Sequence, residues 1–289
     1  MNEEFDTLLE SSFIHIPGIS EKTEKKIWNM GILTWEDLER NISELKNLTE
    51  NLDVIKSYIG GSKRALKSFN INFFKENFPS REYWRLYPKF KSRTLFLDIE
   101  TNGLSKEFQE ITVIGTYYQG KFKTFVNGIN LYDFVPLLDD CFMIVTYNGN
   151  LFDIPYIERT FNVKKKNYIS LDLRWILKRL GYKGGLKSIE KQLGIERPEY
   201  LKDLDGYSAV LLWEKYKNKN YGALHILRRY CLEDVKNLVF LLHIAYNKLC
   251  EMTEFPQKIK PLSDKFKWEI KIDCNISIIE EIRKERYRK

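Results

Sequence analysis

The chain has 289 residues, of which 43% are hydrophobic, so it is long enough for two domains and can fill a sizeable core. This composition excludes a disordered tail protein. No apolar run approaches the roughly 18 to 20 residues that a membrane helix requires. The opening Met1-Asn2-Glu3-Glu4 is acidic where a secretory signal is basic and then apolar, so we expect a cytoplasmic protein that does not enter a membrane.

Cysteine spacing and net charge narrow the class of protein further. The four cysteines form no C-x-x-C pair and the three histidines stand near none of them, which indicates neither a disulfide framework nor a zinc site. The net charge of +7 favours a polyanionic partner only weakly, because a solvated Lys-rich surface explains it equally well. Aromatic residues make up 14% of the chain and offer faces on which bases can stack, although most are expected in the core.

Residues 1–60 are expected to form a small all-helical domain. Pro17-Gly18 predicts a tight turn, Ser20 is placed to cap the helix that follows, and Thr34 is placed to cap the next one. Gly31 stands where the first of these helices should end. The pattern is therefore one of short helices separated by turns.

Two segments are expected to flank the main domain. Residues 61–93 should form a helical linker rich in basic and aromatic side chains, with one helix from about residue 62 to 77. Residues 251–289 should form a C-terminal extension, with a strand-like alternation over 266–272 and a basic run over 283–289. We expect the basic run to be a solvated or disordered end.

The hydrophobic period shortens after residue 93, which indicates an α/β domain over residues 94–250. Compact apolar segments predict five strands, at residues 94–98, 111–118, 121–126, 142–146 and 169–171. Helices are expected at residues 131–138 and 151–161, and helices dominate from there to residue 250. Three strands followed by alternating helix and strand predict a mixed sheet flanked by helices.

Four carboxylates stand out in this domain. Asp98 and Glu100 are spaced by two at the end of a strand, so both leave the same face of the chain. Asp153 follows the fourth strand, and Asp234 lies inside a long helix over residues 221–248. Taken singly, each is more typical of a helix cap or a turn. Brought together they would repel, and oxygen ligands of this number suit two Mg²⁺ or Mn²⁺ ions and phosphodiester hydrolysis.

The residues around these carboxylates form three ordered motifs. They read Asp98-Ile-Glu-Thr-Asn-Gly-Leu104, Asn148-Gly-Asn-Leu-Phe-Asp153 and Tyr230-Cys-Leu-Glu-Asp234. This set resembles the motifs of the DEDD 3′ to 5′ exonucleases, which belong to the ribonuclease H-like superfamily. Arg229 stands where the histidine subclass has its general base, and Tyr230 stands where the tyrosine subclass has its tyrosine. The chain therefore resembles a DEDDy enzyme.

The resemblance implies a ribonuclease H-like fold and a single active site to which all three motifs contribute. Asp98, Glu100, Asp153 and Asp234 would hold two divalent ions, and Tyr230 would orient the attacking water. The first two motifs would also supply the substrate-binding residues, which are Thr101, Asn102, Leu104, Asn148 and Phe152. Leu104 matches the leucine that wedges beside the terminal base, although a core leucine is the rival interpretation. Many relatives carry Thr where this chain has Asn102.

Shorter segments extend the resemblance. The runs Asp172-Leu-Arg-Trp and Asp205-Gly-Tyr are similar to those of the YprB-like group of this superfamily. Residues 14–27 resemble a helix-hairpin-helix element, in which Gly18, Ser20 and Lys22 would bind a phosphate. Such elements usually have a second glycine where this chain has Ser20. A helical cap with no nucleic-acid contact is an equal alternative for this region.

The expected function is a metal-dependent 3′ to 5′ exonuclease that releases nucleoside 5′-monophosphates from a single-stranded end. We favour DNA as the substrate, yet no residue separates it from RNA, because the contact to a 2′-hydroxyl cannot be placed. An RNA-trimming enzyme of the ribonuclease D type shares the motifs. A non-catalytic nucleic-acid-binding subunit is the rival from another class, and the intact set of carboxylates argues against it.

Overall fold

The computed structural model describes residues 5–47, 51–103, 109–163, 168–263, 266, 268 and 270–286. The chain divides into two compact units. The first comprises Met1–Ser92, Asn167–Ile169 and His243–Ser263, and the second comprises Arg93–Lys166, Ser170–Leu242 and Asp264–Lys289. The domain boundaries expected at residues 60, 93 and 250 remain predictions. Among the described residues, no helix combines the length and the apolar character that a membrane span needs.

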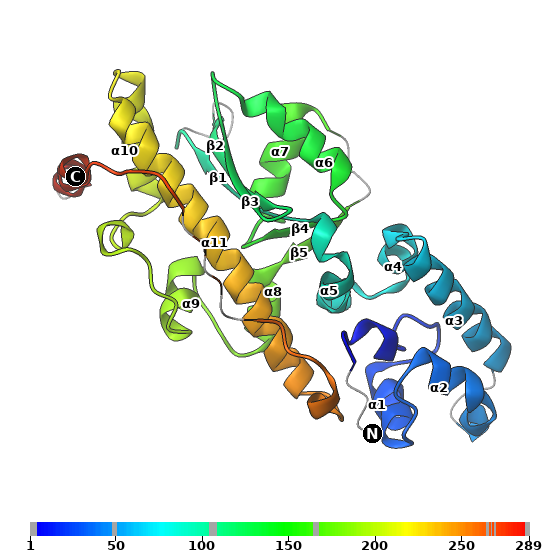
Figure 1. Ribbon diagram of the computed structural model, residues 1–289. Coiled ribbons are helices and arrows are strands. Elements are labelled where there is room, and N and C mark those ends of the chain that lie inside the picture. Colours follow the sequence, from blue (N-terminus) through cyan, green and yellow to red (C-terminus); the bar gives the residue numbers. More distant parts are fainter. Residues whose placement is uncertain are drawn as a thin grey trace. The chain divides into compact units, whose positions relative to one another are not determined.

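The first unit contains the two helices that the sequence predicts after Ser20 and after Thr34, together with three that it does not predict in this form (Figure 1). Their bounds are α1 (Glu21–Asn29), α2 (Trp35–Arg40), α3 (Leu52–Lys67), α4 (Ile71–Asn77) and α5 (Tyr87–Phe90). Both predicted caps are confirmed. The hydroxyl oxygen of Ser20 accepts a hydrogen bond from the N–H of Thr23 at 3.1 Å, and Thr34 forms a capping box with Asp37 at the start of α2.

The single helix expected from residue 62 to 77 is wrong. The chain forms α3 and α4 with a break between them, at which Phe69 takes a left-handed conformation with φ of 55°. Asn70 then caps α4, because its side-chain oxygen accepts a hydrogen bond from the N–H of Asn72 at 3.1 Å. α3 ends before the left-handed Phe69, and the side-chain hydrogen bond of Asn70 begins α4.

A buried ion cluster holds the first unit together. The carboxylate of Glu24, fully buried, accepts hydrogen bonds from the N–H groups of Phe13 and Ile14 and from the guanidinium of Arg85 at 2.9 Å. Arg85 also donates to Glu82 at 2.8 Å. Removing one partner would leave an uncompensated charge in the interior, so this cluster fixes the helices around it.

The second unit contains a mixed five-stranded sheet, as the sequence predicts. The strands are β1 (Thr94–Thr101), β2 (Ile111–Tyr118), β3 (Lys121–Val126), β4 (Met143–Thr146) and β5 (Ile169–Asp172), and their order in the sheet is β3-β2-β1-β4-β5. β1 pairs antiparallel with β2 and parallel with β4. β1 is therefore the central strand, and it extends three residues beyond the strand expected over 94–98.

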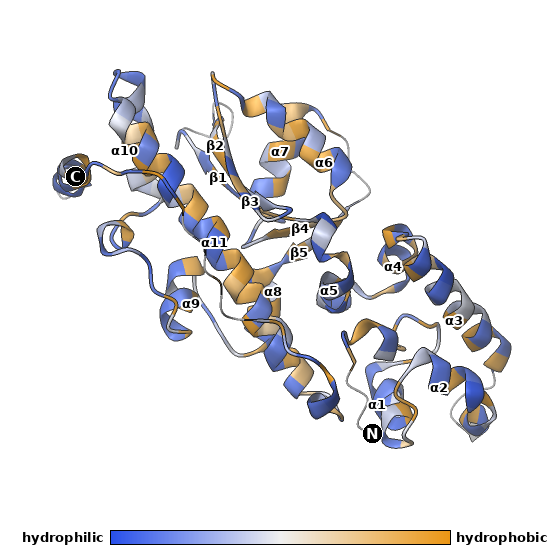
Figure 2. Ribbon diagram, viewed as in Figure 1, coloured by the Kyte–Doolittle hydropathy of each residue, from blue (hydrophilic) through white to orange (hydrophobic). Residues whose placement is uncertain are grey.

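Helices cover both faces of this sheet. Figure 1 shows α6 (Val135–Asp140) and α7 (Asp153–Phe161) on one side and α10 (Gly206–Lys217) and α11 (Tyr221–Glu251) on the other. α8 (Leu173–Arg179) and α9 (Leu186–Gln192) lie between α7 and α10 along the chain. Figure 2 shows many hydrophobic residues along α6 and α11, and apolar side chains of β2, α10 and α11 form one buried cluster. The core of this unit thus lies between the sheet and its helices.

The face of β1 that carries the acidic residues is the face that α11 covers. Asp98 pairs with Gly115 and Glu100 with Val113 across the antiparallel ladder, so these four residues share one side of the sheet. A methyl group built on Gly115 would lie 2.7 Å from the sulfur of Cys231 on α11. The absence of a side chain at residue 115 therefore lets α11 approach the acidic end of β1 closely.

The C-terminal segment differs from expectation. Residues 283–286 belong to a helix, α12 (Ile276–Arg286), whose Ile278, Ile279 and Ile282 are buried. Arg283 pairs with Asp203 at 3.3 Å. The expectation of a solvated or disordered basic end is wrong for these residues, because an apolar stripe at helical spacing precedes the basic run. No strand forms at the described residues within 266–272, and residues 287–289 lie outside the described residues.

We predict that Gly115→Ala destabilises the protein by roughly 1 to 3 kcal/mol, because the added methyl group overpacks the contact between β2 and α11. Urea unfolding followed by circular dichroism measures the effect. Gly206→Ala is the matched control, since a methyl group there meets no atom within 4 Å. Adding Cys231→Ala to the Gly115→Ala variant should restore part of the loss. An unchanged urea midpoint in Gly115→Ala would show that α11 does not need this close approach.

Candidate metal centre and active site

The site begins where β1 runs past its parallel neighbour. The pairing of β1 with β4 ends at Phe96, so the next backbone groups of β1 are free of that strand. The N–H of Ile99 donates instead to the carboxylate of Asp153, the first residue of α7, at 3.1 Å. Because Asp98 and Glu100 flank Ile99 in sequence, this single bond brings carboxylates from two of the three motifs to one end of the sheet.

The loop that carries Asp153 is held in place by tight packing and by a buried carboxylate. A methyl group on Gly149 would lie 2.2 Å from the hydroxyl oxygen of Thr146, so only glycine fits there. Asn148 takes a left-handed conformation with φ of 62°. The buried Asp172 accepts hydrogen bonds from the N–H groups of Asn148 at 2.8 Å and of Arg174 at 3.0 Å, which ties this loop to the start of α8.

The third group of residues comes from α11. Tyr230 and Asp234 stand one helical turn apart, so both side chains lie on the same face of the helix. Both are buried. Between them, the thiol of Cys231 donates to the carboxylate of Asp98 over 3.7 Å. The motifs on β1, α7 and α11 are therefore adjacent in the second unit.

Two cations that the sequence analysis did not single out lie among these acids. Arg197 is buried, pairs with Asp234, and donates two hydrogen bonds of 2.6 Å to Glu190. Glu190 also accepts from the side chain of Asn237 on α11 at 2.9 Å. The amine of Lys187 lies 4.9 Å from the centre of the Tyr230 ring, is shielded from solvent and has no hydrogen-bond partner. Lys187 and Glu190 stand one turn apart on α9. This spacing of opposite charges is the sequence signal that could have drawn attention to these two residues.

Burial and the charges of neighbouring groups raise the pKa values of all four carboxylates. Burial, and then the charges of Asp234, Glu100 and Asp153, raise the pKa of Asp98 well above its ordinary value. Burial, and then Asp234 and Asp153, do the same to the pKa of Glu100. Burial raises the pKa of Asp153 to about 7. Burial also raises the pKa of Asp234 to about 6, although the neighbouring Arg197 opposes that shift.

The donor set fits hard divalent cations. Ligand atoms of Asp98, Glu100 and Cys231 lie within 4.8 Å of one another. Burial and the neighbouring carboxylates raise the pKa of the Cys231 thiol well above its ordinary value, so the sulfur stays protonated and is a poor ligand. The oxygens that remain are those of carboxylates whose repulsion a cation would relieve, and such oxygens are the ligands that Mg²⁺ and Mn²⁺ prefer.

The substrate-binding residues expected around the first motif have local partners. The hydroxyl of Thr101 accepts a hydrogen bond from the Gln109 side chain at 2.7 Å, and the side-chain oxygen of Asn102 accepts from the N–H of Glu110 at 3.1 Å. These two bonds join the end of β1 to the residues just before β2. Leu104 lies outside the described residues. Their contacts with a substrate therefore stay predictions.

The remaining expected residues lie in both units. Asn148 accepts a hydrogen bond from Arg174 at 2.5 Å, and the ring of Phe152 packs on another aromatic ring of α7. In the first unit, Gly18, Ser20 and Lys22 are exposed around the turn before α1. Gly18 takes a left-handed conformation with φ of 85°. Phosphate binding by this turn stays a prediction.

The fold and the acidic site define a domain of the ribonuclease H-like class. A sequence model of the RNase H superfamily matches residues 95–246, more than half of the chain, and the chain belongs to this superfamily. Among solved structures, the family B DNA polymerase from the archaeon Pyrobaculum calidifontis is similar at 16% identity and a TM-score of 0.42. That similarity covers 58% of this chain and 27% of the polymerase chain. A comparison with curated proteins gave no match.

The raised pKa values of the carboxylates predict that the free energy of unfolding depends on pH. The pKa of Asp153 in the folded protein, about 7, lies above the ordinary value of 3.8, so the folded state keeps a proton that the unfolded chain releases. In EDTA, the free energy of unfolding should therefore fall by roughly 2 to 3 kcal/mol as the pH rises from about 5 to about 8. Thermal unfolding across this range measures the loss, and the isosteric Asp153→Asn should reduce it, with the remainder due to the other raised carboxylates.

The same carboxylates should bind cations more strongly as they lose their protons. Mg²⁺ or Mn²⁺ should raise the melting temperature more at about pH 8 than at about pH 5.5, since bound protons compete with the ion. A pH-independent shift that survives Asp153→Asn would place the cation elsewhere.

Proposed function

We propose that the chain is a metal-dependent 3′ to 5′ exonuclease that removes nucleoside 5′-monophosphates from a single-stranded end. Members of the RNase H superfamily are mostly nucleases. The observation that carries the proposal is the convergence of Asp98, Glu100, Asp153 and Asp234, with their raised proton affinities, beside the buried Tyr230. This arrangement supports assignment to the DEDDy type and to its YprB-like group.

The carboxylates are the proposed holders of two divalent ions. Asp98, Glu100 and Asp234 would hold one, and Asp98 together with Asp153 would hold the other. Two divalent ions held by these residues would supply activation of the attacking water and stabilisation of the charge on the leaving 3′ oxygen. The N–H of Ile99 fixes the orientation of Asp153 through its hydrogen bond to one carboxylate oxygen.

Tyr230 is proposed to orient the attacking water through its hydroxyl group. Burial, and then the charges of Asp234 and Glu100, raise the pKa of this phenol above its ordinary value, so it is neutral at physiological pH. A neutral phenol can donate one hydrogen bond and accept others, which suits a group that positions water. It does not suit a strong base, so proton removal is not assigned to Tyr230.

The choice between DNA and RNA, and the direction of cleavage, are decided by one experiment. DNA and RNA strands of matching sequence, labelled at the 5′ or at the 3′ end, are incubated with Mn²⁺ or with EDTA. We expect metal-dependent shortening from the 3′ end, with DNA preferred. Preferred trimming of RNA would instead identify an enzyme of the ribonuclease D type. Binding without cleavage of either strand would contradict the proposal and indicate a non-catalytic subunit.

Asp98→Asn should lower the cleavage rate by more than about 100-fold, because it removes a ligand shared by both ions. Binding of a labelled single strand in EDTA should change by less than about threefold, since the substitution leaves the basic side chains that would bind the strand unchanged. Cleavage of end-labelled oligonucleotides and fluorescence anisotropy measure the two effects. Asp133→Asn, an exposed carboxylate after β3, is the matched control. Cleavage by Asp98→Asn within about tenfold of the parent would refute the assignment of Asp98.

Tyr230→Phe should slow single-turnover cleavage by roughly 10- to 100-fold and leave strand affinity nearly unchanged. The ring keeps its packing in this variant, and only the hydroxyl that would position the water is removed. Rapid-quench measurements with enzyme in excess isolate the chemical step. Tyr132→Phe, at an exposed tyrosine, controls for removal of a hydroxyl elsewhere. Equal single-turnover rates for Tyr230→Phe and the parent would make Tyr230 a core residue.

A further inference from the structure

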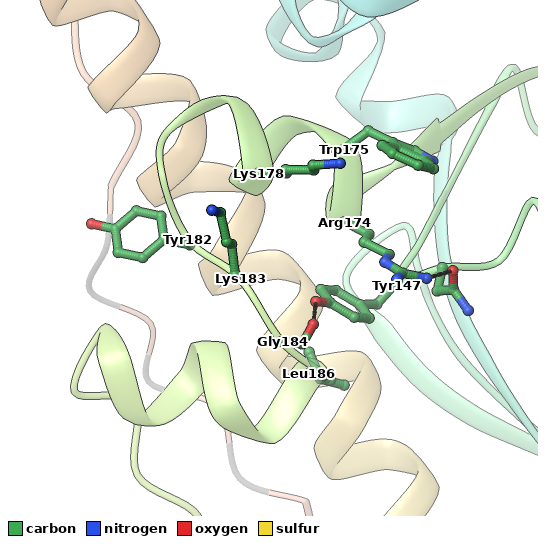
Figure 3. Close-up of a pocket in the computed structure, with 10 residues that line it drawn as sticks. Tyr147, Arg174, Trp175, Lys178, Tyr182, Lys183, Gly184 and Leu186 are labelled. Carbon is green, nitrogen blue, oxygen red and sulfur yellow. Dashed lines mark hydrogen bonds between the residues drawn. The ribbon is translucent and has the colours of Figure 1, made fainter.

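A cavity of about 520 Å³ lies in the second unit beside the acidic site (Figure 3). Its volume falls within the range of small-molecule and nucleotide pockets. The lining comes from the end of β4, from α8 and from the turn before α9, namely Tyr147, Asn148, Arg174, Trp175, Lys178, Tyr182, Lys183, Gly184, Gly185 and Leu186. Of these residues, Asn148 belongs to the second motif, and Arg174 and Trp175 belong to the run Asp172-Leu-Arg-Trp that resembles the YprB-like group.

The lining is strongly cationic. Arg174, Lys178 and Lys183 contribute three positive charges, and the lining contains no Asp or Glu. Within the described part of the chain, none of the three cations forms an ion pair with a carboxylate. Three uncompensated cations around one cavity attract an anion, and phosphate groups are the anions that a protein of this superfamily encounters on its substrates.

The lining also offers an aromatic platform. Trp175 is 51% exposed, although tryptophan is usually well buried. The amine of Lys178 lies 5.1 Å from the centre of the indole ring, and Figure 3 shows Lys178 pointing toward Trp175. Tyr147 is fixed by a hydrogen bond of 2.6 Å from its hydroxyl to the carbonyl of Gly184. An exposed indole beside cations suits a nucleic-acid base stacked on the ring, with its phosphate near the amines.

The cavity shares two structural elements with the acidic site. Asn148 lines the cavity and belongs to the loop that ends at Asp153, and its side-chain oxygen accepts a hydrogen bond from Arg174 at 2.5 Å. Leu186 lines the cavity, and the next residue, Lys187, places its amine at the ring of Tyr230. Two of the residues that line the cavity are therefore close in sequence to residues of the acidic site, and both regions belong to the second unit.

We propose that this cavity binds an internal nucleotide of the strand whose 3′ end occupies the carboxylates. Trp175 stacks on the base, and Lys178 and Lys183 bind the adjacent phosphates. Arg174 holds Asn148 and adds positive charge. The inference rests on the proposed exonuclease function and adds to it that strands long enough to reach the cavity bind more tightly than dinucleotides.

Binding measured as a function of strand length tests this directly. Fluorescein-labelled oligothymidylates of two and eight nucleotides are titrated in EDTA, which prevents cleavage. Trp175→Ala should weaken binding of the octamer by roughly tenfold and change dinucleotide binding by less than about twofold. Trp175→Phe keeps an aromatic face and should recover most of the octamer affinity. Tyr132→Ala, at an exposed aromatic residue outside the cavity, is the matched control and should behave as the parent.

The contribution of the cavity's positive charge is tested by the salt dependence of strand binding. Replacing Lys178 and Lys183 together by Gln should lower the slope of log affinity against log salt by about 0.7 for each phosphate that the variant no longer binds. The control pair replaces Lys121 and Lys123, both exposed on β3, and should leave the slope unchanged. An octapeptide of glutamate tests for a general polyanion site. Displacement of the octamer by that peptide at equal charge would overturn the assignment to a nucleotide.

The outcomes separate this inference from the proposed function. If the parent cleaves single strands and Trp175→Ala binds dinucleotide and octamer as the parent does, the cavity is not a strand subsite and the exonuclease assignment stands. If the parent neither binds nor cleaves any strand, the proposed function fails and the subsite fails with it. A weakening confined to the octamer, recovered in Trp175→Phe, supports the subsite.

Discussion

The second unit is organised around the repulsion between four carboxylates at the end of β1. Burial raises the pKa of every member, and repulsion from neighbouring carboxylates adds to this effect, with Glu190 as the repelling group at Asp234. Such a cluster is stable only where positive groups are fixed nearby. The chain supplies the guanidinium of Arg197, the amine of Lys187 and the N–H of Ile99, each held by a different element. α7, α9 and α11 carry Asp153, Lys187 and Asp234, so the packing of these helices brings acids and compensating groups together.

Hydrogen bonds and ion pairs hold Arg197, which balances the charge of Asp234, in one position. Its guanidinium lies between Glu190 and Asp234, and Asn237 bonds to Glu190 from α11. Because each member of this buried network has a partner on another element, the side chain of Asp234 is fixed before any ion or substrate arrives. Burial and the two carboxylates oppose each other at Arg197, and the carboxylates prevail, so the pKa of the guanidinium stays above its ordinary value. Pre-organisation of this kind lowers the cost of binding a cation.

The sequence predicts the parts of this site that depend on short-range geometry. A spacing of two on a strand places Asp98 and Glu100 on one face, and a spacing of four on a helix does the same for Tyr230 and Asp234. The mixed sheet follows from strand-length apolar segments and is confirmed. Arg197 was missed because a single arginine in a loop has no periodic pattern, and only the folded chain brings it to Asp234.

Local hydrogen bonds and short apolar stripes explain the two wrong predictions of secondary structure. The left-handed Phe69 follows the end of α3 and Asn70 caps the start of α4, so local backbone geometry and a cap outweigh the hydrophobic period. The basic run at the C-terminus has the charge of a solvated tail, but buried isoleucines stand one to five residues before it. Ile278, Ile279 and Ile282 bury one face of α12, and the arginines that follow then reach acids near α10.

In the proposed exonuclease, the acidic site and the basic cavity would meet opposite electrostatic requirements of one nucleic-acid strand. Carboxylates that hold cations are needed for hydrolysis, yet before the ions bind they repel a polyanionic strand. Affinity for such a strand must therefore come from positive charge outside the carboxylates but close enough to bind neighbouring phosphates. Asp172 connects the two regions, because it accepts hydrogen bonds from the loop before Asp153 and from the start of α8, which carries Arg174 and Trp175. One buried carboxylate thus fixes the spacing between the residues that would cut the strand and those that would hold it.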